Sequence, residues 1–241
     1  MKVEGKNAVT ELFASNSKIE KLVIQQNLKQ ELDNLVYQAK RKNVKLIFSP
    51  KEVLDKESTT KHHQGVIAYI NGYVYSTVDE MFNLAKKQNE QPFLVLVDEV
   101  ADPHNLGSLI RSCECAGVHG IIIPKNRACQ VNDTVIKVST GACFNIKIAC
   151  VNNLNECIKD IKEKGVWVYS LEANGESMYS TDLTGSIALV VGSEGFGVSK
   201  LTKKLSDGIL SLPMKGKINS LNASVAGGIA IYEVLRQRLS K

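Results

Sequence analysis

The feature that most constrains the fold is a series of short, uninterrupted apolar runs in the last two thirds of the chain. Residues 93–97 read Phe-Leu-Val-Leu-Val, residues 120–124 read Gly-Ile-Ile-Ile-Pro, and residues 187–191 read Ile-Ala-Leu-Val-Val. A strand that is apolar on both faces belongs to a sheet covered on both faces, as in α/β proteins with parallel strands. Apolar residues at helical spacing separate the runs. The pattern therefore predicts an α/β fold with a mostly parallel sheet, followed by a long helix over residues 220–239.

The first 70 residues predict a smaller α/β unit. A helix is expected from Asn7, and a second helix over residues 28–42 lies between two apolar segments, residues 22–24 and 44–48. The polar stretch that follows, which ends in Gln-Asn-Glu-Gln-Pro, is the best candidate for a linker, with one short helix inside it. We therefore expect three parts: a small domain at residues 1–70, a linker at 71–91, and a larger domain at 92–241.

Composition excludes several classes of protein. Apolar residues make up 44% and charged residues 23% of the chain, which is typical of a globular protein and not of a disordered one. No run approaches the roughly 20 apolar residues of a membrane helix, and the N-terminus lacks a secretory apolar segment, so a cytoplasmic protein is expected. Residues 1–70 carry 12 basic and 8 acidic residues, most of the net charge of +5. This asymmetry slightly favours a polyanionic partner for the small domain.

Patterns for other chemistries are absent. The chain has no GxxxxGK[ST] segment, and Gly192-x-x-Gly195-x-Gly197 reverses the spacing of a dinucleotide fingerprint. The six cysteines fall within residues 113–157 without a CxxC pair or zinc-type spacing. We expect them to be free, buried, reduced thiols and expect no metal ion.

Three polar loops follow predicted strands, at residues 98–111, 191–197 and 212–224. Because ligands bind at the carboxyl ends of strands in open α/β sheets, these loops are expected to meet at one edge. Each candidate residue has a plain structural interpretation: Asn105 as a helix cap, Arg111 as a solvated charge, and Ser220 or Asn222 as a cap of the last helix. Their joint occurrence with Glu194 favours a functional site.

These loops resemble the three motifs of the SPOUT-class (TrmH/SpoU-type) RNA ribose 2′-O-methyltransferases. The matching segments are PHNLGSLIRSCECAG, LVVGSEGFGVSK and LPMKGKINSLNASVAGGIAIYEVLRQR. The segments EGKNAV, at residues 4–9, and HQGVIA, at residues 63–68, resemble the small RNA-binding domain of this family, which is similar to ribosomal protein L30e. The nearest resemblance is to the branch that methylates guanosine in bacterial 23S rRNA, and it implies a homodimer.

The resemblance also implies a cofactor and a topology. It implies S-adenosylmethionine, held mainly by backbone groups at Gly192, Leu212 and Leu221, with Leu171 as a weaker candidate. It further implies a trefoil knot made by the C-terminal segment. Small residues on the last helix, among them Gly227 and Gly228, suit a helix that packs closely against backbone, although an ordinary core helix would have the same composition.

The catalytic and RNA-binding residues are likewise carried over by motif. The implied catalytic set is Arg111, Glu194, Asn105, Ser220 and Asn222, and the implied RNA-binding set is Asn7, His63, Gln64 and Arg111. In the family the arginine is held to activate the ribose hydroxyl, but a guanidinium is practically never deprotonated in a protein. Arg111 as a base and Arg111 as a phosphate clamp therefore both remain open.

The expected function is transfer of a methyl group from S-adenosylmethionine to a ribose 2′-OH of RNA, in particular of a 23S rRNA guanosine. Two alternatives stand beside it. One is a tRNA ribose 2′-O-methyltransferase, which differs only in substrate. The other is a catalytically inert RNA-binding module involved in ribosome assembly, but such a module would have no reason to keep all five catalytic candidates.

Overall fold

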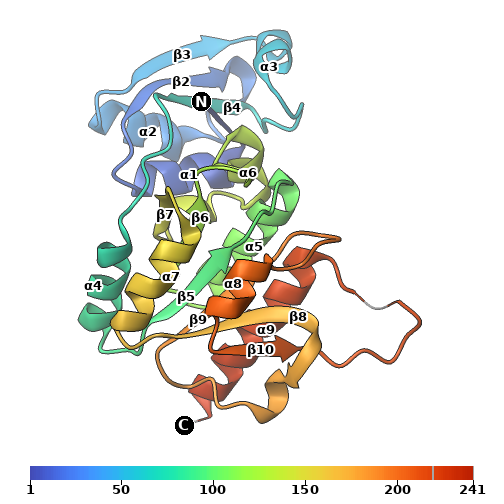
Figure 1. The fold of residues 1–241 in the computed structure, drawn as a ribbon. Helices are drawn as coiled ribbons and strands as arrows, with labels where there is room; N and C mark the ends of the chain where they lie inside the picture. The colour runs from blue at the N-terminus through green and yellow to red at the C-terminus, as the bar shows by residue number, and fades with distance from the viewer. Residues whose placement is uncertain (219, 241) are drawn as a thin grey trace. The chain divides into compact units, whose positions relative to one another are not determined.

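The computed structural model describes residues 1–218 and 220–240, so that Asn219 of the third loop and Lys241 lie outside the described residues. Contacts divide the chain into two compact units. The first contains Met1–Val74 and Val131–Asn145, and the second contains Tyr75–Gln130 and Ile146–Lys241. Both are α/β units, as expected (Figure 1).

The first unit has a four-stranded sheet in the order β1-β4-β2-β3, in which β2 and β3 are parallel and the other pairs antiparallel. Its strands are β1 (Lys2–Glu4), β2 (Ile19–Gln25), β3 (Lys45–Ser49) and β4 (Val66–Ile70). Its helices from the N-terminal segment are α1 (Lys6–Ala14), the 3-10 turn η1 (Gln26–Leu28), α2 (Asp33–Arg41) and α3 (Lys51–Glu57). The predicted β-α-β order is present as β2-α2-β3. Strand β1 was not predicted, because three residues are too few to show a period of two.

A segment from the middle of the sequence completes the first unit. It contains α6 (Asp133–Val138) and the 3-10 turn η2 (Ala142–Phe144). The backbone N–H of Lys2 donates to Asp133 Oδ1 at 3.1 Å, and Gly141 lies against α1 with a positive φ of 89°. A Cβ added at Gly141 would come within 2.8 Å of the Ala8 Cα. The unit therefore needs residues well beyond the expected boundary at residue 70.

The second unit has a six-stranded sheet in the order β10-β8-β9-β5-β6-β7, and all its strand pairs are parallel. The strands are β5 (Phe93–Val97), β6 (Gly120–Pro124), β7 (Ile148–Val151), β8 (Trp167–Ser177), β9 (Ile187–Val191) and β10 (Gly208–Ser211). The predicted parallel sheet is confirmed. The adjacent inner strands β9, β5 and β6 are the continuous apolar runs, and every residue in them is buried.

Helices cover this sheet: α4 (Val78–Gln88), α5 (Pro103–Cys115), α7 (Leu154–Glu163), α8 (Lys200–Leu205) and α9 (Ala223–Leu239), with the 3-10 turn η3 (Met178–Ser180). Helix α4 lies within the expected linker, yet its Met81 is fully buried in the core beside Leu94 and Ile122. Gly120 makes room for it, because a Cβ there would collide with the Met81 sulfur. The contacts thus join residues 75–91 to the second unit.

Helix α9 packs along α5 (Figure 1). A Cβ on Gly227 would come within 2.6 Å of Leu109 Cδ1 and 3.2 Å of Val191 Cγ2. The small residue at this position therefore permits the close approach. Strand pairings and helix contacts show which elements are neighbours, but they do not show whether the C-terminal segment passes through a loop. The trefoil knot therefore stays a prediction.

Candidate active site

The sheet order brings the ends of four strands together. Strand β9 lies between β5 and β8, and β10 pairs with β8 on the far side. Because all of these strands are parallel, the loops that follow them emerge at the same carboxyl edge, where open α/β sheets bind ligands. The three polar loops singled out in the sequence follow β5, β9 and β10.

Asn222 connects residues from all three loops. It caps α9, with its Oδ1 accepting hydrogen bonds from Ser224 N at 3.0 Å and Val225 N at 3.2 Å. Its Nδ2 donates to Asn105 Oδ1 at 2.9 Å and to Glu194 Oε1. The backbone thus fixes the orientation of the Asn222 amide, and the amide in turn fixes the other two side chains. Three of the five catalytic candidates are therefore in direct contact.

Asn105 is a supporting residue of this network and not the cap of its helix. Helix α5 is capped by Asp102, whose Oδ1 accepts a hydrogen bond from His104 N at 3.1 Å. Asn105 lies in the first turn and is only 7% exposed. Its side-chain oxygen faces Asn222, so its amide nitrogen remains as a donor at the edge of the sheet.

Arg111 lies farther along α5 and is exposed. Among residues 1–218 and 220–240, its guanidinium forms no hydrogen bond or ion pair, in contrast to Asn105 and Asn222. A guanidinium has five N–H donors and keeps its charge at any physiological pH. Arg111 therefore offers a complete set of donors for an anion that arrives from solvent.

A cavity of about 520 Å³ opens among the loops. The four predicted cofactor-binding residues all line it, namely Leu171, Gly192, Leu212 and Leu221. Glu194, Ser220 and Asn222 line it as well. The walls thus combine leucine side chains with glycines and polar side chains, a combination that suits a ligand with a flat apolar ring and polar edges. Arg111 and Asn105 are not among the lining residues.

The glycine-rich loop after β9 is a tight turn. Ser193 and Gly197 exchange two backbone hydrogen bonds, of 3.1 Å and 3.0 Å, and leave Glu194, Gly195 and Phe196 at the tip. Gly195 and Gly197 have positive φ angles of 89° and 67°, which glycine adopts without steric cost. A Cβ on Gly192 would collide with the backbone of Gly197 and Val198, so the loop folds back directly on the strand end.

Two buried or half-buried carboxylates that sequence reasoning missed hold the base of this turn. Val198 N donates to Glu172 Oε1 at 2.7 Å, and Ser199 N donates to Asp98 Oδ2 at 2.8 Å. Glu172 also forms an ion pair of 3.4 Å with Lys203. Both acids come shortly after a buried strand segment, toward the carboxyl edge, which is the signal that could have found them. They fix the loop that carries Glu194.

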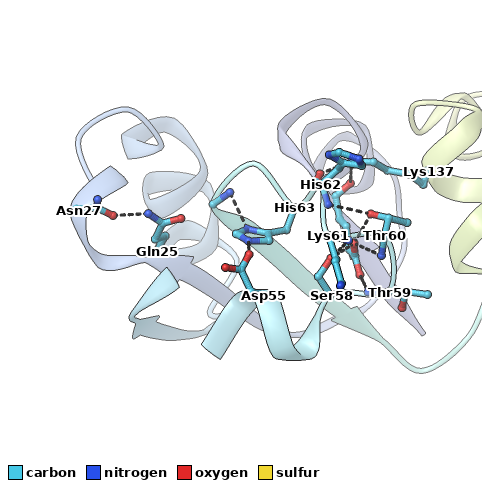
Figure 2. A network of polar contacts seen from close by, with 12 residues as sticks. Gln25, Asn27, Asp55, Ser58, Thr59, Thr60, Lys61, His62, His63 and Lys137 are labelled. Carbon is cyan, nitrogen blue, oxygen red and sulfur yellow. Dashed lines mark hydrogen bonds and ion pairs between the residues drawn. The ribbon is translucent and has the colours of Figure 1, made fainter. Parts of the chain in front are cut away.

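In the first unit, two of the residues predicted to bind RNA, His63 and Gln64, lie in the loop 58–65, and Asn7 lies in α1. Figure 2 shows His63 within this loop. This loop is attached to Glu4 of β1, which is only 3% exposed. The Glu4 carboxylate accepts hydrogen bonds from Ser58 Oγ at 2.7 Å, Thr59 N at 2.6 Å and Thr60 Oγ1 at 2.8 Å. Burial by itself would raise the pKa of Glu4, but these hydrogen bonds outweigh burial and hold the pKa below its usual range.

His63 supports the same loop from within. Its ring is 4% exposed, its Nε2 lies 2.9 Å from Asp55 Oδ1, and its Nδ1 accepts a hydrogen bond from Gly65 N at 2.9 Å. Both ring nitrogens are therefore used inside the protein. Sequence reasoning placed His63 at the RNA, whereas the structure leaves its neighbours Lys61 and His62 exposed to solvent.

Asn7, in the first turn of α1, and Gln64, in the loop 58–65, are both exposed. Gln64 has a positive φ of 51°, and its Oε1 accepts a hydrogen bond from Lys6 N at 2.9 Å. Lys137, from α6, donates to the backbone oxygen of His62 at 2.6 Å (Figure 2). The segment 131–145 thus helps to hold the loop 58–65 in place.

The remaining reactive groups do not form a second centre. In the described structure the six cysteines form no disulfide; three of them are buried as expected, whereas Cys115 is exposed. Burial raises the pKa of Cys143 to about 12 and that of Cys157 to about 11. In the described part of the chain, no cluster of three or more potential metal ligands is present. None of its helices is both long and apolar enough to cross a bilayer.

Family models match nearly the whole sequence. Residues 92–232 match the SpoU rRNA Methylase family, and residues 2–76 match a model described as RNA 2′-O ribose methyltransferase substrate binding. Among curated relatives, a Bacillus subtilis protein named "Putative TrmH family tRNA/rRNA methyltransferase YacO" is 42% identical over 238 residues, covering 98% of this chain and 95% of its own length. A relative from Staphylococcus haemolyticus, named as a member of the same family, is 38% identical over 239 residues, covering 98% of this chain and 95% of its own.

Two solved structures share the fold over nearly the full length of this chain, and a third shares it over two thirds. The SpoU methyltransferase AviRb from Streptomyces viridochromogenes, in complex with AdoMet, has a TM-score of 0.86 at 24% identity and covers 100% of this chain and 91% of its own. An AdoMet-bound rRNA methyltransferase from Sinorhizobium meliloti has a TM-score of 0.83 at 23% identity, covering 98% of this chain and 86% of its own. A TrmH/SpoU tRNA modifying enzyme from A. aeolicus, at 26% identity and a TM-score of 0.56, covers only 66% of this chain and 85% of its own.

Proposed function

This chain belongs to the SpoU/TrmH family of RNA 2′-O-ribose methyltransferases, and on that premise we propose that it methylates a guanosine ribose in 23S rRNA with S-adenosylmethionine as the methyl donor. The observation that carries the proposal is the cavity at the carboxyl edge of the sheet. It combines the four predicted cofactor-binding residues with the Asn222–Glu194 contact in one place.

The cavity fits the cofactor in chemistry. Leu171, Leu212 and Leu221 offer apolar surfaces to the adenine, and backbone groups near Gly192 and Leu212 can read its edge. When bound, S-adenosylmethionine supplies a methyl group on a sulfonium centre, which is already activated for transfer. The residues of this chain therefore have to position the ribose oxygen and prepare it as a nucleophile.

Arg111 is proposed as the phosphate clamp of the target nucleotide. It keeps its proton, so it cannot remove the proton of the 2′-OH. Its free planar fork can instead bind two phosphate oxygens at once and stabilise the negative charge that develops on the 2′-oxygen. The absence of an ion pair on Arg111 among the described residues supports this role, since no protein partner has to be displaced.

The Asn105–Asn222–Glu194 network is proposed to orient the ribose. Glu194 is exposed and can accept a hydrogen bond or a proton from the ribose, and the proton of the 2′-OH leaves to this carboxylate, to a phosphate oxygen or to water. Ser220 lies at the cavity wall as a neutral donor and acceptor. The family assignment and this set together argue against the inert RNA-binding module.

Ribosomal rather than transfer RNA is favoured by the extent of the similarity. The S. meliloti structure described as an rRNA methyltransferase corresponds to nearly the whole chain, whereas the A. aeolicus tRNA modifying enzyme corresponds to two thirds of it. The substrate-binding match at residues 2–76 is the additional part. An RNA substrate made in the cytoplasm implies a cytoplasmic enzyme.

A homodimer is part of the proposal, and α9 supports it. Val225, Ile229, Tyr232 and Leu239 are exposed large apolar residues. Their spacing of four, three and seven residues places them on one stripe of the helix, opposite the face that packs on α5. Such a stripe is expected to be covered by a second copy, and sedimentation equilibrium of the Tyr232→Arg variant tests this.

Transfer of labelled methyl groups tests the activity. Unmodified 23S rRNA and total tRNA are each incubated with the protein and labelled S-adenosylmethionine, and the product is mapped to single nucleotides. We expect a 2′-O-methylated guanosine in 23S rRNA. Label in tRNA alone would overturn the choice of substrate, and label in neither RNA would overturn the activity.

A further inference from the structure

We propose that Phe196 is a stacking platform for a nucleobase of the RNA substrate, close to the ribose that is methylated. The proposal rests on the proposed function and names a substrate contact beyond the catalytic, cofactor-binding and RNA-binding candidates carried over from the family. Phe196 is 88% exposed, the most exposed of the large apolar residues in the described chain. It also lines the cavity described above.

The turn that carries Phe196 is held rigidly. Ser193 and Gly197 close it with two backbone hydrogen bonds, and Glu172 and Asp98 bind the two backbone N–H groups that follow. The ring therefore projects from a fixed base and not from a loose loop. A preorganised aromatic side chain loses little conformational entropy on binding, which favours a contact role.

Covalent geometry explains why a base should arrive there. Glu194, two residues before Phe196 on the same turn, contacts Asn222 at the proposed ribose site. A nucleobase is attached to C1′, the carbon next to the one that bears the 2′-OH. When the ribose binds at this edge, the base attached to it, or the base of an adjacent nucleotide, therefore lies close to the turn. Unstacked bases in single-stranded RNA commonly stack on aromatic side chains.

Other apolar residues near the cavity or on the surface already have proposed roles that differ from base stacking. The leucines of the cavity wall already offer surfaces to the adenine of the cofactor, whereas Phe196 lines the cavity and still leaves 88% of its surface exposed for a second ligand. The exposed stripe on α9 provides a separate surface for a second copy. An aromatic ring at the mouth of the cavity faces whatever enters from solvent, and the proposed substrate enters from there.

The test compares Phe196→Ala, Phe196→Leu and Phe196→Tyr with a matched control, Tyr179→Ala, which removes an exposed aromatic residue of η3 that does not line the cavity. Single-turnover methylation of 23S rRNA gives the RNA concentration for half-maximal rate, and calorimetry gives the Kd for S-adenosylmethionine. Stacking on one base predicts about a 10- to 100-fold higher RNA requirement for Ala and Leu, an unchanged Kd for the cofactor, and near wild-type values for Tyr and the control.

A spectroscopic measurement is independent of methyl transfer. The chain has one tryptophan, Trp167, so a Phe196→Trp variant in a Trp167→Phe background reports from position 196 alone. Titration with unmodified 23S rRNA should quench its emission as the base stacks on the indole. If the wild-type protein methylates no RNA, the proposed function fails, and this titration still decides whether position 196 contacts a base.

Three results would overturn the inference. Full activity of Phe196→Leu would mean that an apolar contact suffices and that stacking is absent. A loss of cofactor affinity in Phe196→Ala that matches the loss of RNA affinity would make the ring a cavity wall. A loss of self-association in sedimentation equilibrium would assign Phe196 to a contact between copies.

Discussion

Loop 58–65 of the first unit and the cavity loops of the second unit were both expected to contact RNA, but their polar groups are used differently. In the loop 58–65, His63 has both ring nitrogens occupied, and the Glu4 carboxylate accepts hydrogen bonds from three consecutive residues. In the second unit, Arg111 has no hydrogen-bond or ion-pair partner among the described residues, and Glu194 is exposed. In the first unit the buried polar residues fix the conformation of the loop 58–65. In the second unit charged side chains remain accessible to a substrate.

The difference predicts different responses to mutation. Removing a free group such as Arg111 should abolish a reaction step and leave the fold unchanged, because nothing in the protein depends on it. Removing a fully satisfied group such as Glu4 should leave buried donors unpaired and disturb the loop. Substitutions at the cavity loops should therefore lower the rate of methyl transfer, and substitutions that disturb the loop 58–65 should lower the affinity for RNA.

Arg111 is the position with the largest expected effect. Loss of one preorganised charged contact typically costs on the order of 100- to 1000-fold in rate. If Arg111 clamps the phosphate with two donors, Arg111→Lys should fail almost as badly as Arg111→Ala in single-turnover methylation with saturating RNA. Cofactor binding and Tm should stay as in the wild type.

Arg127→Ala serves as the control for this series, because Arg127 is exposed and pairs with Glu99 away from the cavity lining. Substantial activity in Arg111→Lys would show that a point charge is enough. Near wild-type rates in Arg111→Ala would remove Arg111 from the catalytic set.

Gly197→Ala should have the next largest effect, and it acts on the cofactor. Gly197 has a positive φ of 67°, and a Cβ there would come within 2.6 Å of Glu172 Oε1. Holding a non-glycine residue in this region costs about 1–3 kcal/mol, so calorimetry should show roughly tenfold weaker cofactor binding. Gly185→Ala, with open space around it, should bind normally. Unchanged affinity in Gly197→Ala would mean that the turn does not shape the cavity.

Lys137→Met should weaken RNA binding by a few fold. Its ammonium group holds the backbone oxygens of Glu4 and His62, so its loss should loosen the loop 58–65. Filter binding of 23S rRNA at several salt concentrations measures the effect, and cofactor binding should be unaffected. Lys40→Met, on α2, is the control. Equal losses in both variants would indicate a general charge effect, because phosphate contacts of any lysine depend on salt.

The smallest expected effect concerns pH. The folded pKa of Glu4 lies below its unfolded value, so its stabilising contribution is complete above the unfolded pKa and is lost as pH falls through the folded pKa. Unfolding in urea should therefore show a loss of stability as pH falls below 4.5, the ordinary pKa of a glutamate, and Glu4→Gln should partly remove this loss. An identical pH profile for both proteins would contradict the role assigned to the Glu4 hydrogen bonds.

The parallel sheet could be predicted because continuous apolar runs such as residues 93–97 are typical of strands that are covered on both faces. The collection of Asn105, Glu194 and Asn222 at one edge followed from the same reasoning, since loops after parallel strands emerge on one side. Asp98 and Glu172 were missed because their position after a buried strand segment indicates only that they lie near the carboxyl edge. It does not show whether such a carboxylate binds backbone N–H groups or faces water.

The burial of His63 and the placement of residues 131–145 could not be predicted either. The spacing of apolar residues indicates which face of a segment is buried. It contains no information on which of two sheets that segment packs against. Only tertiary contacts, such as that of Asp133 with the Lys2 backbone, assign the segment to the first unit.

Residues 131–145 belong to the first unit but follow part of the second unit in the sequence, and this order has a consequence for biosynthesis. The first unit lacks α6 and η2 until translation has passed residue 145, roughly 70 residues after the end of its N-terminal part. At about 5–20 residues per second, that is a delay of several seconds. During this interval Gly141 is not yet in place against α1, and β5 has already been made without β9, its neighbour in the sheet. The two units are therefore expected to mature in alternation as the nascent chain emerges, and not one after the other.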